Sequence, residues 1–76
     1  MRVNRIPEAA TIQVNGEPEA LSAATLTGLL EERGIEPGGR GLAIALNGAV
    51  VPRAAWAQTA LHPGDAVEIV QAKQGG

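Results

Sequence analysis

The sequence has no cysteine, no phenylalanine and no tyrosine, and each absence excludes a class of structure or chemistry. Without a thiol there can be no disulfide, no zinc site built on thiolates and no cysteine nucleophile. Trp56 is the single aromatic residue. A folded domain with this sequence must therefore fill its core almost entirely with aliphatic side chains.

Positive charge and long hydrophobic runs are also scarce. The six lysines and arginines are spread from Arg2 to Lys73, and the formal net charge is −2. With neither a basic patch nor an aromatic platform, the chain is poorly suited to bind nucleic acid. No apolar stretch approaches the length of a membrane span, and the opening "MRVNRIPEAA" lacks the apolar run of a signal peptide. We therefore expect a cytoplasmic protein with no membrane partner.

Side chains that commonly build catalytic or metal sites are few. His62 is the only histidine and lies in "LHPGD", where Asp65 most simply hydrogen-bonds the backbone of a turn. One histidine and dispersed carboxylates show no metal-ligand spacing, and "PGGRG" lacks the Lys-Ser/Thr pair of a phosphate-binding loop. An enzyme is therefore the least favoured interpretation, and we expect neither a catalytic residue nor a metal site.

Alternating hydrophobic segments are what the sequence does contain. Its 76 residues, 45% of them hydrophobic, suit one folded domain. "TIQVNGE" alternates and then reaches Asn15-Gly16, a strong hairpin signal, so "EPEAL" is the predicted return strand. Pro18 cannot donate to a sheet ladder, which places that strand at an edge. "LAIALNG" and Val50-Val51 predict a second hairpin around Asn47-Gly48, and "AVEIVQA" predicts the last strand.

One segment, "TLTGLLEERG", has the spacing of a helix rather than a strand. Its leucines fall at i, i+3 and i+4, with Thr25 as the predicted N-cap and Gly34 just past the C-terminus. Gly28 within it costs roughly 1 kcal/mol relative to alanine. The order hairpin, helix, hairpin, connection, strand predicts an α+β fold in which one helix packs on a mixed sheet. We expect an N-terminal arm over residues 1–9, a domain over 10–72 and a flexible C-terminal tail over 73–76.

The tail ends the sequence on two bare glycines in "QAKQGG". Glycine is the residue that costs most to order, so such an end is either inert or needed for its thinness and flexibility. Lys73, Gln74, Gly75 and Gly76 together reach at most about 13 to 14 Å. Such a tail can enter a narrow channel, and its terminal carboxylate can be activated by adenylation and then attacked by a nucleophile. The residues alone leave both interpretations open.

Two surface features also have two interpretations each. In "VVPR" and the following Trp56, Pro52 ends a strand and Trp56 fills the end of the core, or a partly exposed Trp56 beside Arg53 contacts a partner. Ala43, Ala45 and Val70 form either an ordinary exposed sheet face or a flat face of small residues for a partner.

Taken together, these segments resemble the ThiS family, the ubiquitin-like sulfur carrier proteins of thiamine biosynthesis. The matching pieces are the opening strand, "TLTGLLEERGI", "AIALNGAVVPRAAW", "LHPGDAVEIVQA" and the terminal "GG", which span most of residues 10–76. The resemblance implies a β-grasp fold with a mixed sheet of four or five strands packed on one main helix. It also implies that the first and last strands are adjacent and parallel.

The resemblance further implies a carrier and not a catalyst, with no cofactor bound by the carrier itself. A ubiquitin-activating-type adenylyltransferase would use ATP and magnesium to adenylate the carboxylate of Gly76. A cysteine desulfurase or similar sulfur donor would supply the sulfur of a thiocarboxylate, and thiazole synthase would take that sulfur. The family's partners would bind the tail from Lys73 to Gly76. The lack of cysteine agrees, since a sulfur carrier without a thiol can hold sulfur only at its carboxyl end.

Two alternatives remain beside this interpretation. The small subunit of molybdopterin synthase has the same fold and the same thiocarboxylate chemistry but a different acceptor. A ubiquitin-like binding or modifier module would have the fold without sulfur chemistry. The Val-Pro-Arg stretch with Trp56 favours the thiamine carriers.

Overall fold

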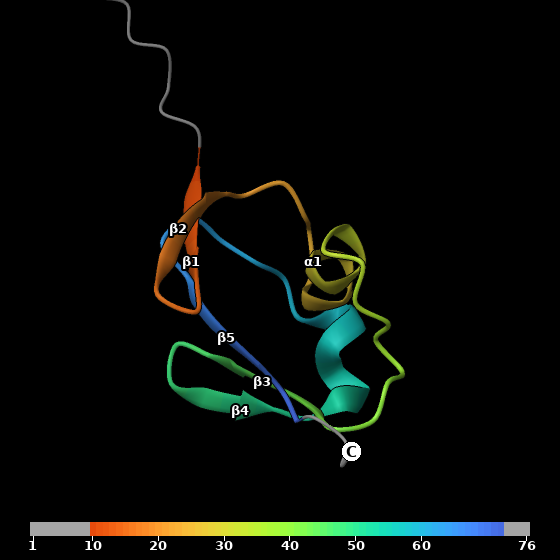
Figure 1. Ribbon diagram of the computed structural model, residues 1–76. Helices are drawn as coiled ribbons and strands as arrows, with labels where there is room; N and C mark the ends of the chain where they lie inside the picture. The colour runs from red at the N-terminus through yellow and green to blue at the C-terminus, as the bar shows by residue number, and fades with distance from the viewer. Residues whose placement is uncertain (1–9, 73–76) are drawn as a thin grey trace, which may run out of the picture.

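Within the described residues, five β-strands form one mixed sheet, and one α-helix packs on one of its faces (Figure 1). The computed structural model describes residues 10–72, so the predicted arm over 1–9 and the tail over 73–76 lie outside the described residues. The elements in chain order are β1 (Thr11–Val14), β2 (Glu17–Ala20), α1 (Leu26–Glu32), β3 (Leu42–Leu46), β4 (Ala49–Val51), the 3-10 helix η1 (Arg53–Gln58) and β5 (Ala66–Gln71).

Strand β5, the last in the sequence, lies in the middle of the sheet. The strand order is β2-β1-β5-β3-β4, with β5 parallel to β1 and antiparallel to β3. The first and last strands are therefore adjacent and parallel, as the resemblance implied. The predicted β-grasp fold, a mixed sheet packed on one main helix, is confirmed.

Both predicted hairpins turn at Asn-Gly pairs. Asn15 and Gly16 have φ angles of 52° and 84°, and Asn47 and Gly48 have 51° and 89°. Positive φ at both central positions is the requirement of a type I′ turn, which joins two twisted strands in the fewest residues. Strand β2, which contains Pro18, forms one edge of the sheet, as its missing backbone donor predicted.

Helix α1 begins and ends where its capping residues predicted. The Thr25 hydroxyl accepts a hydrogen bond from the Gly28 N–H at 3.1 Å, which satisfies one of the free donors of the first turn. At the other end, Gly34 has a φ of 75°, and the N–H groups of Gly34 and Ile35 donate to the carbonyls of Glu31 and Leu30. This pattern of two bonds past a left-handed glycine is a Schellman motif.

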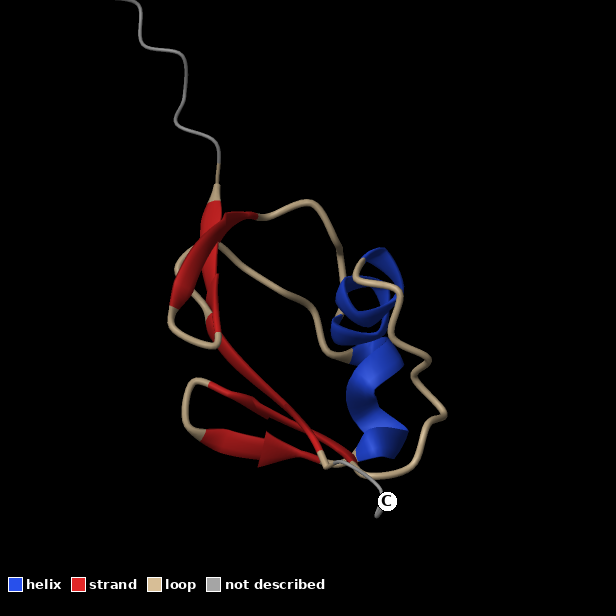
Figure 2. Ribbon diagram, in the orientation of Figure 1, coloured by secondary structure: helices blue, strands red, loops and turns tan. Residues whose placement is uncertain are grey.

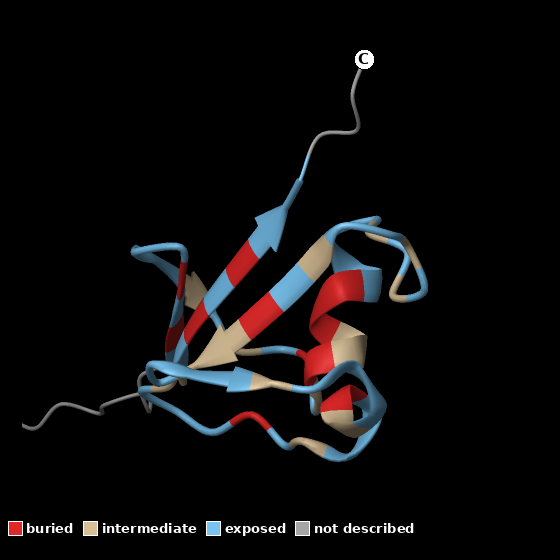
Figure 3. Cartoon of the chain, turned by 90° about the horizontal axis from the view of Figure 1, so that it is seen from below, coloured by how far each residue is buried: buried red, intermediate tan, exposed pale blue. Residues whose placement is uncertain are grey.

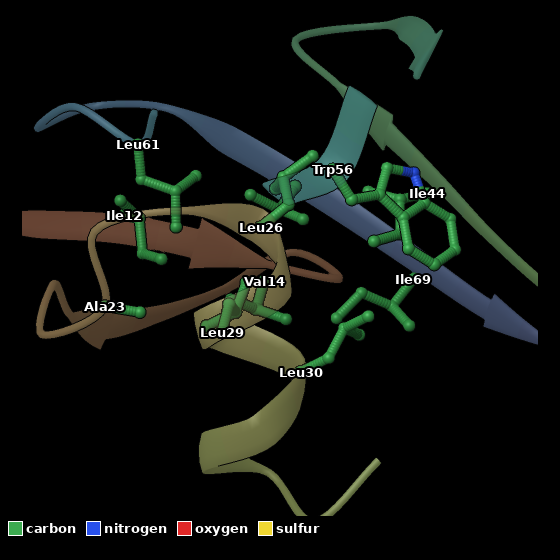
Figure 4. Packing of buried hydrophobic residues seen from close by; sticks show 11 residues of the cluster. Ile12, Val14, Ala23, Leu26, Leu29, Leu30, Ile44, Trp56, Leu61 and Ile69 are labelled. Atoms are coloured by element: carbon green, nitrogen blue, oxygen red, sulfur yellow. The ribbon is translucent and has the colours of Figure 1, made fainter. Parts of the chain in front are cut away.

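The core lies between the sheet and the helical layer. Figure 2 shows α1 and η1 on the same side of the sheet, and Figure 3 shows buried and exposed positions alternating along β5. Trp56 stands at one end of the cluster and Leu61 at the other (Figure 4). Within the described residues no helix has the length and hydropathy needed to span a membrane. The buried residues are Ile12, Val14, Ala23, Leu26, Leu29, Leu30, Ile44, Trp56, Leu61, Val67 and Ile69.

Candidate functional site

Ala72, the last described residue, follows β5 directly and is the point at which the predicted tail begins. The predicted modified residue, Gly76, and the predicted partner-binding residues Lys73, Gln74 and Gly75 lie outside the described residues. What the structure does define is the support from which that tail leaves. We refer to Ala72 and its contact with Gly41 as the tail root.

Strand β5 is held along most of its length by β3 and at its start by β1. Strand β3 pairs with it as far as its last residue, Leu42 opposite Gln71, whereas β1 pairs only with its first two residues. Beyond β1, the Asn15 side chain continues the pairing: its Nδ2 donates to the Ile69 carbonyl at 3.3 Å, and its Oδ1 accepts from the Ile69 N–H at 2.8 Å. The strand that leads into the tail is therefore fixed on both sides up to Ile69 and on one side beyond it.

The tail root depends on a glycine. The Ala72 N–H donates to the Gly41 carbonyl oxygen at 2.7 Å, and Gly41 has a φ of 71°, in the left-handed region. A Cβ at position 41 would lie 3.2 Å from both the Cβ and the carbonyl oxygen of Ala72. Glycine thus allows the backbone before β3 to approach the end of β5 closely enough to bond it.

The loop that leads to Gly41 is held by Arg53. The guanidinium donates to the carbonyl oxygens of Pro37 and Gly39, the second at 2.8 Å. The same group lies over the Trp56 ring, 4.8 Å from its centroid, in the geometry of a cation–π contact. Arg53 therefore joins the loop to the end of the hydrophobic core.

Trp56 itself belongs to the core. Its side chain is 2% exposed, and its indole Nε1–H donates to the Val51 carbonyl at 2.8 Å. The alternative in which a partly exposed Trp56 contacts a partner is wrong for this indole, because an aliphatic core with no other aromatic residue encloses it. Arg53 is exposed, and a contact between Arg53 and a partner stays a prediction.

The face of the sheet opposite the helix carries exposed aliphatic side chains. Val50 is 77% exposed and Val70 59% exposed, and with Ala43 and Ala45 they border a shallow hollow of about 220 Å³. The residues predicted to share one face do lie together. Whether this face contacts a partner stays a prediction.

His62 and Asp65 form a turn before β5, as predicted. The Asp65 carboxylate accepts from the His62 N–H at 2.8 Å and from the Asn47 side-chain Nδ2 at 3.0 Å. The hydrogen bond from Asn47 is the main cause that holds the pKa of Asp65 below its ordinary value, and the bond from the His62 backbone adds to it. Among residues 10–72, no three histidine, aspartate or glutamate side chains converge as a metal site would require.

The asparagine side chains are the supporting residues that the sequence did not reveal. Asn15 and Asn47 were recognised only for their turns, yet both side chains also bind the backbone of β5. Asn47 Oδ1 accepts from the Ala66 N–H at 2.9 Å, at the start of that strand. No local signal predicts these bonds, because Asn15 and Ile69 are 54 residues apart.

Comparison with known proteins gives a consistent match. The model of the ThiS family matches residues 8–76. The sulfur carrier protein ThiS of Thermus thermophilus is 38% identical over 65 residues, which cover 86% of this chain and 98% of that protein. The crystal structure of the thiamine biosynthesis protein ThiS from Geobacter metallireducens is 32% identical with a TM-score of 0.70, covering 87% of this chain and 99% of that one. A solution structure of a thiamine biosynthesis protein from the same organism has the same identity and TM-score and covers 87% of each chain.

Proposed function

This chain belongs to the ThiS family, and from that membership we propose that it is the sulfur carrier for the thiazole ring of thiamine. The observation that carries the proposal is the extent of the match. The family model continues to residue 76 and so includes the terminal Gly-Gly pair. The relative from Thermus thermophilus, which is named a sulfur carrier protein, aligns over 98% of its length. Like that relative, this chain acts as a small carrier and not as a catalyst.

The proposed chemistry takes place at the carboxylate of Gly76. A carboxylate oxygen attacks the α-phosphorus of ATP, and the acyl-adenylate forms as pyrophosphate leaves. A sulfur donor at the oxidation level of sulfide then attacks the acyl carbon. The carbon–sulfur bond forms, the bond from carbon to the adenylate oxygen breaks, and AMP leaves. The resulting thiocarboxylate is a sulfur nucleophile at the end of a removable carrier.

The sequence supports this chemistry in two ways. The chain has no cysteine, so no thiol competes with the carboxyl end as the place where sulfur is held. Gly75 and Gly76 have no side chains, so the acyl carbon can be reached by an enzyme that encloses the tail. A fixed β5 with its pairing to β3 gives the tail a rigid base.

The partners follow from the same chemistry. A ubiquitin-activating-type adenylyltransferase would bind ATP and magnesium and form the adenylate. A cysteine desulfurase or a similar donor, together with a thiol reductant that releases its persulfide sulfur as sulfide, would supply the sulfur, and thiazole synthase would accept it. The carrier itself would bind none of these small molecules, and Lys73 to Gly76 would be the segment that enters each active site.

The test is thiolation of the purified protein. Incubation with the adenylyltransferase, ATP and a sulfur source should exchange one oxygen for sulfur, which intact-mass spectrometry detects. Deletion of Gly75 and Gly76 should abolish the exchange while the circular dichroism spectrum stays unchanged. A deletion variant that still gained sulfur would exclude the proposed chemistry.

A second step identifies the acceptor. The thiolated protein is given to thiazole synthase and, separately, to the large subunit of molybdopterin synthase. We expect sulfur transfer to the thiazole product. Transfer only to the precursor of molybdopterin would contradict the thiamine assignment and leave the thiocarboxylate chemistry in place.

A further inference from the structure

We propose that Arg53 is a positioning residue for the C-terminal tail, acting through the loop at residues 37–41 and the tail root. The proposal rests on the proposed function, because it concerns how the tail is presented to the enzyme that adenylates it. Its physical basis is a series of contacts that runs from the core to Ala72, all of them within the described residues.

The first part of the series is the loop, which has little order of its own. Four of its five residues are proline or glycine, in the sequence "PGGRG" at positions 37–41. Glycine has the largest backbone freedom to lose, so such a segment keeps one conformation only when something outside it holds it there. Among the described residues, the hydrogen bonds to its middle are the two from Arg53 and the bond from the Gly39 N–H to the Glu36 carbonyl.

The second part is the arginine, whose own position is fixed. Its guanidinium lies over Trp56, and the Trp56 indole is buried and bonded to the Val51 carbonyl. A guanidinium can donate in parallel to two carbonyl oxygens because its N–H groups form a planar fork. Arg53 thereby fixes two carbonyl groups of the loop relative to the core.

The third part is the tail root. Gly41 lies two residues after Gly39, and its carbonyl accepts the N–H of Ala72. On the β1 side, the pairing of β5 ends with the Asn15 side chain at Ile69. On the β3 side the pairing reaches Leu42 opposite Gln71, and the bond between Ala72 and Gly41 extends it by one residue. Within the described residues, this bond is the last contact of the chain before the tail. Fixing the direction in which the chain leaves β5 reduces the range of positions that a carboxylate four residues further on can sample.

The proposal differs from two simpler roles for Arg53. If Arg53 contacted the adenylyltransferase directly through its charge, Arg53→Lys would restore much of the function and Arg53→Ala would mainly raise KM. If Arg53 only stabilised the fold, its loss would not matter at temperatures where the variant is fully folded. If Arg53 has a positioning role, its substitution lowers kcat even in fully folded protein. Lysine does not restore kcat, because an ammonium group lacks the planar fork of the guanidinium.

The first measurement does not involve function. Amide hydrogen exchange is followed by NMR at Ala72, with the amides of Gln13 and Asn47 as internal references, because they bond the carbonyls of Asp65 and Ala66 at the far end of β5. In Arg53→Ala and Arg53→Lys, exchange at Ala72 should be about fivefold faster, the factor for one ordinary hydrogen bond, while the references stay unchanged. Unchanged exchange at Ala72 would overturn the proposal whatever the protein's function.

The second measurement is the steady-state rate of adenylation by the activating enzyme. The rate is monitored through the release of pyrophosphate, at a temperature where all variants are folded. Both Arg53 variants should lose about tenfold in kcat with KM within about twofold of the wild type, since misplacing a reacting group costs rate and not binding. Arg33→Ala removes an exposed arginine that pairs with Glu19, outside the loop and the tail root, and is the matched control. Equal losses in the Arg33 and Arg53 variants, or a change in KM alone, would overturn the positioning role.

Gly41→Ala tests the tail root without altering Arg53. The added Cβ would lie 3.2 Å from Ala72, and alanine would have to adopt the left-handed φ of position 41. The variant should therefore show the same faster amide exchange at Ala72 and the same lower kcat. A kcat equal to that of the wild type in a variant with faster exchange at Ala72 would overturn the inference and leave the proposed function intact. If the wild-type protein is not adenylated at all, the proposed function fails, and this inference fails with it.

Discussion

At the scale of single residues, a few side-chain amides and one carboxylate determine how β5 is held. Asn15 bonds the backbone of Ile69 near the end of the strand, and Asn47 bonds Ala66 at its start. Both residues combine this role with a positive φ in a type I′ turn. The turns could be predicted from the Asn-Gly pairs. The bonds to β5 could not, because they depend on which strand lies next to each turn.

The role of the Asn15 side chain can be tested by Asn15→Gly. Glycine accepts the positive φ of the turn, so the substitution removes chiefly the two bonds to Ile69. We expect a loss of about 1 to 2 kcal/mol in the free energy of unfolding, measured by urea denaturation. A value within a few tenths of the wild type would mean that the amide does not hold β5.

The carboxylate of Asp65 makes a prediction about pH. Its pKa is lowered from the ordinary value of 3.8, mainly by the hydrogen bond from Asn47. A group whose pKa is lower in the folded state contributes stability above its unfolded pKa and loses that contribution as pH falls through its folded pKa. The contribution of Asp65 should therefore be present at neutral pH and disappear as pH falls below about 4.

Asn47→Gly tests whether the hydrogen bond from Asn47 lowers the pKa of Asp65. Glycine keeps the turn but removes the Nδ2 donor, so an NMR titration should find the pKa of Asp65 raised toward 3.8. The loss of stability between neutral and acid pH should become smaller in the same variant. An unchanged Asp65 pKa would assign the shift to the His62 backbone bond and contradict the role given to Asn47.

At the scale of the elements, local sequence patterns predicted the strands and the helix that pack together in the fold. Alternation predicted the strands, leucine spacing predicted α1, and Thr25 and Gly34 predicted its ends. The segment from Arg53 to Gln58 is a 3-10 helix. Its sequence has no helical period, because Trp56 is its only buried residue. Its position depends on that one anchor in the core.

Gly28 is a position in α1 where a substitution should raise the stability of the fold. An added Cβ would lie 3.5 Å from both the Ala23 Cβ and the Thr25 Oγ1, which are ordinary contact distances. Gly28→Ala should therefore raise the free energy of unfolding by about 0.5 to 1 kcal/mol, because alanine has less backbone entropy to lose in a helix. Thermal and urea unfolding measure this gain. Gly41→Ala is the contrasting variant and should lower stability, since its φ is positive.

At the scale of the whole molecule, the pattern of the sequence predicted the class of fold but not the strand order. Hairpin, helix, hairpin and strand are compatible with several arrangements of a mixed sheet. The family resemblance implied only that the first and last strands are adjacent and parallel, and the position of β5 between β1 and β3 comes from the structure. The same long-range pairing creates the tail root, because it brings Ala72 beside Gly41. Contacts of this kind depend on the complete fold, which is why the support of the tail was not predicted while the tail itself was.

The most direct test of the central claim is to locate the sulfur in the thiolated protein. Tandem mass spectrometry of the intact chain, after incubation with the adenylyltransferase, ATP and a sulfur source, assigns the exchanged atom to a residue. We predict that every fragment containing Gly76 carries the oxygen-to-sulfur exchange and that no fragment ending before Gly76 does. Sulfur at any internal position, or a chain that is adenylated but never acquires sulfur, would contradict the account.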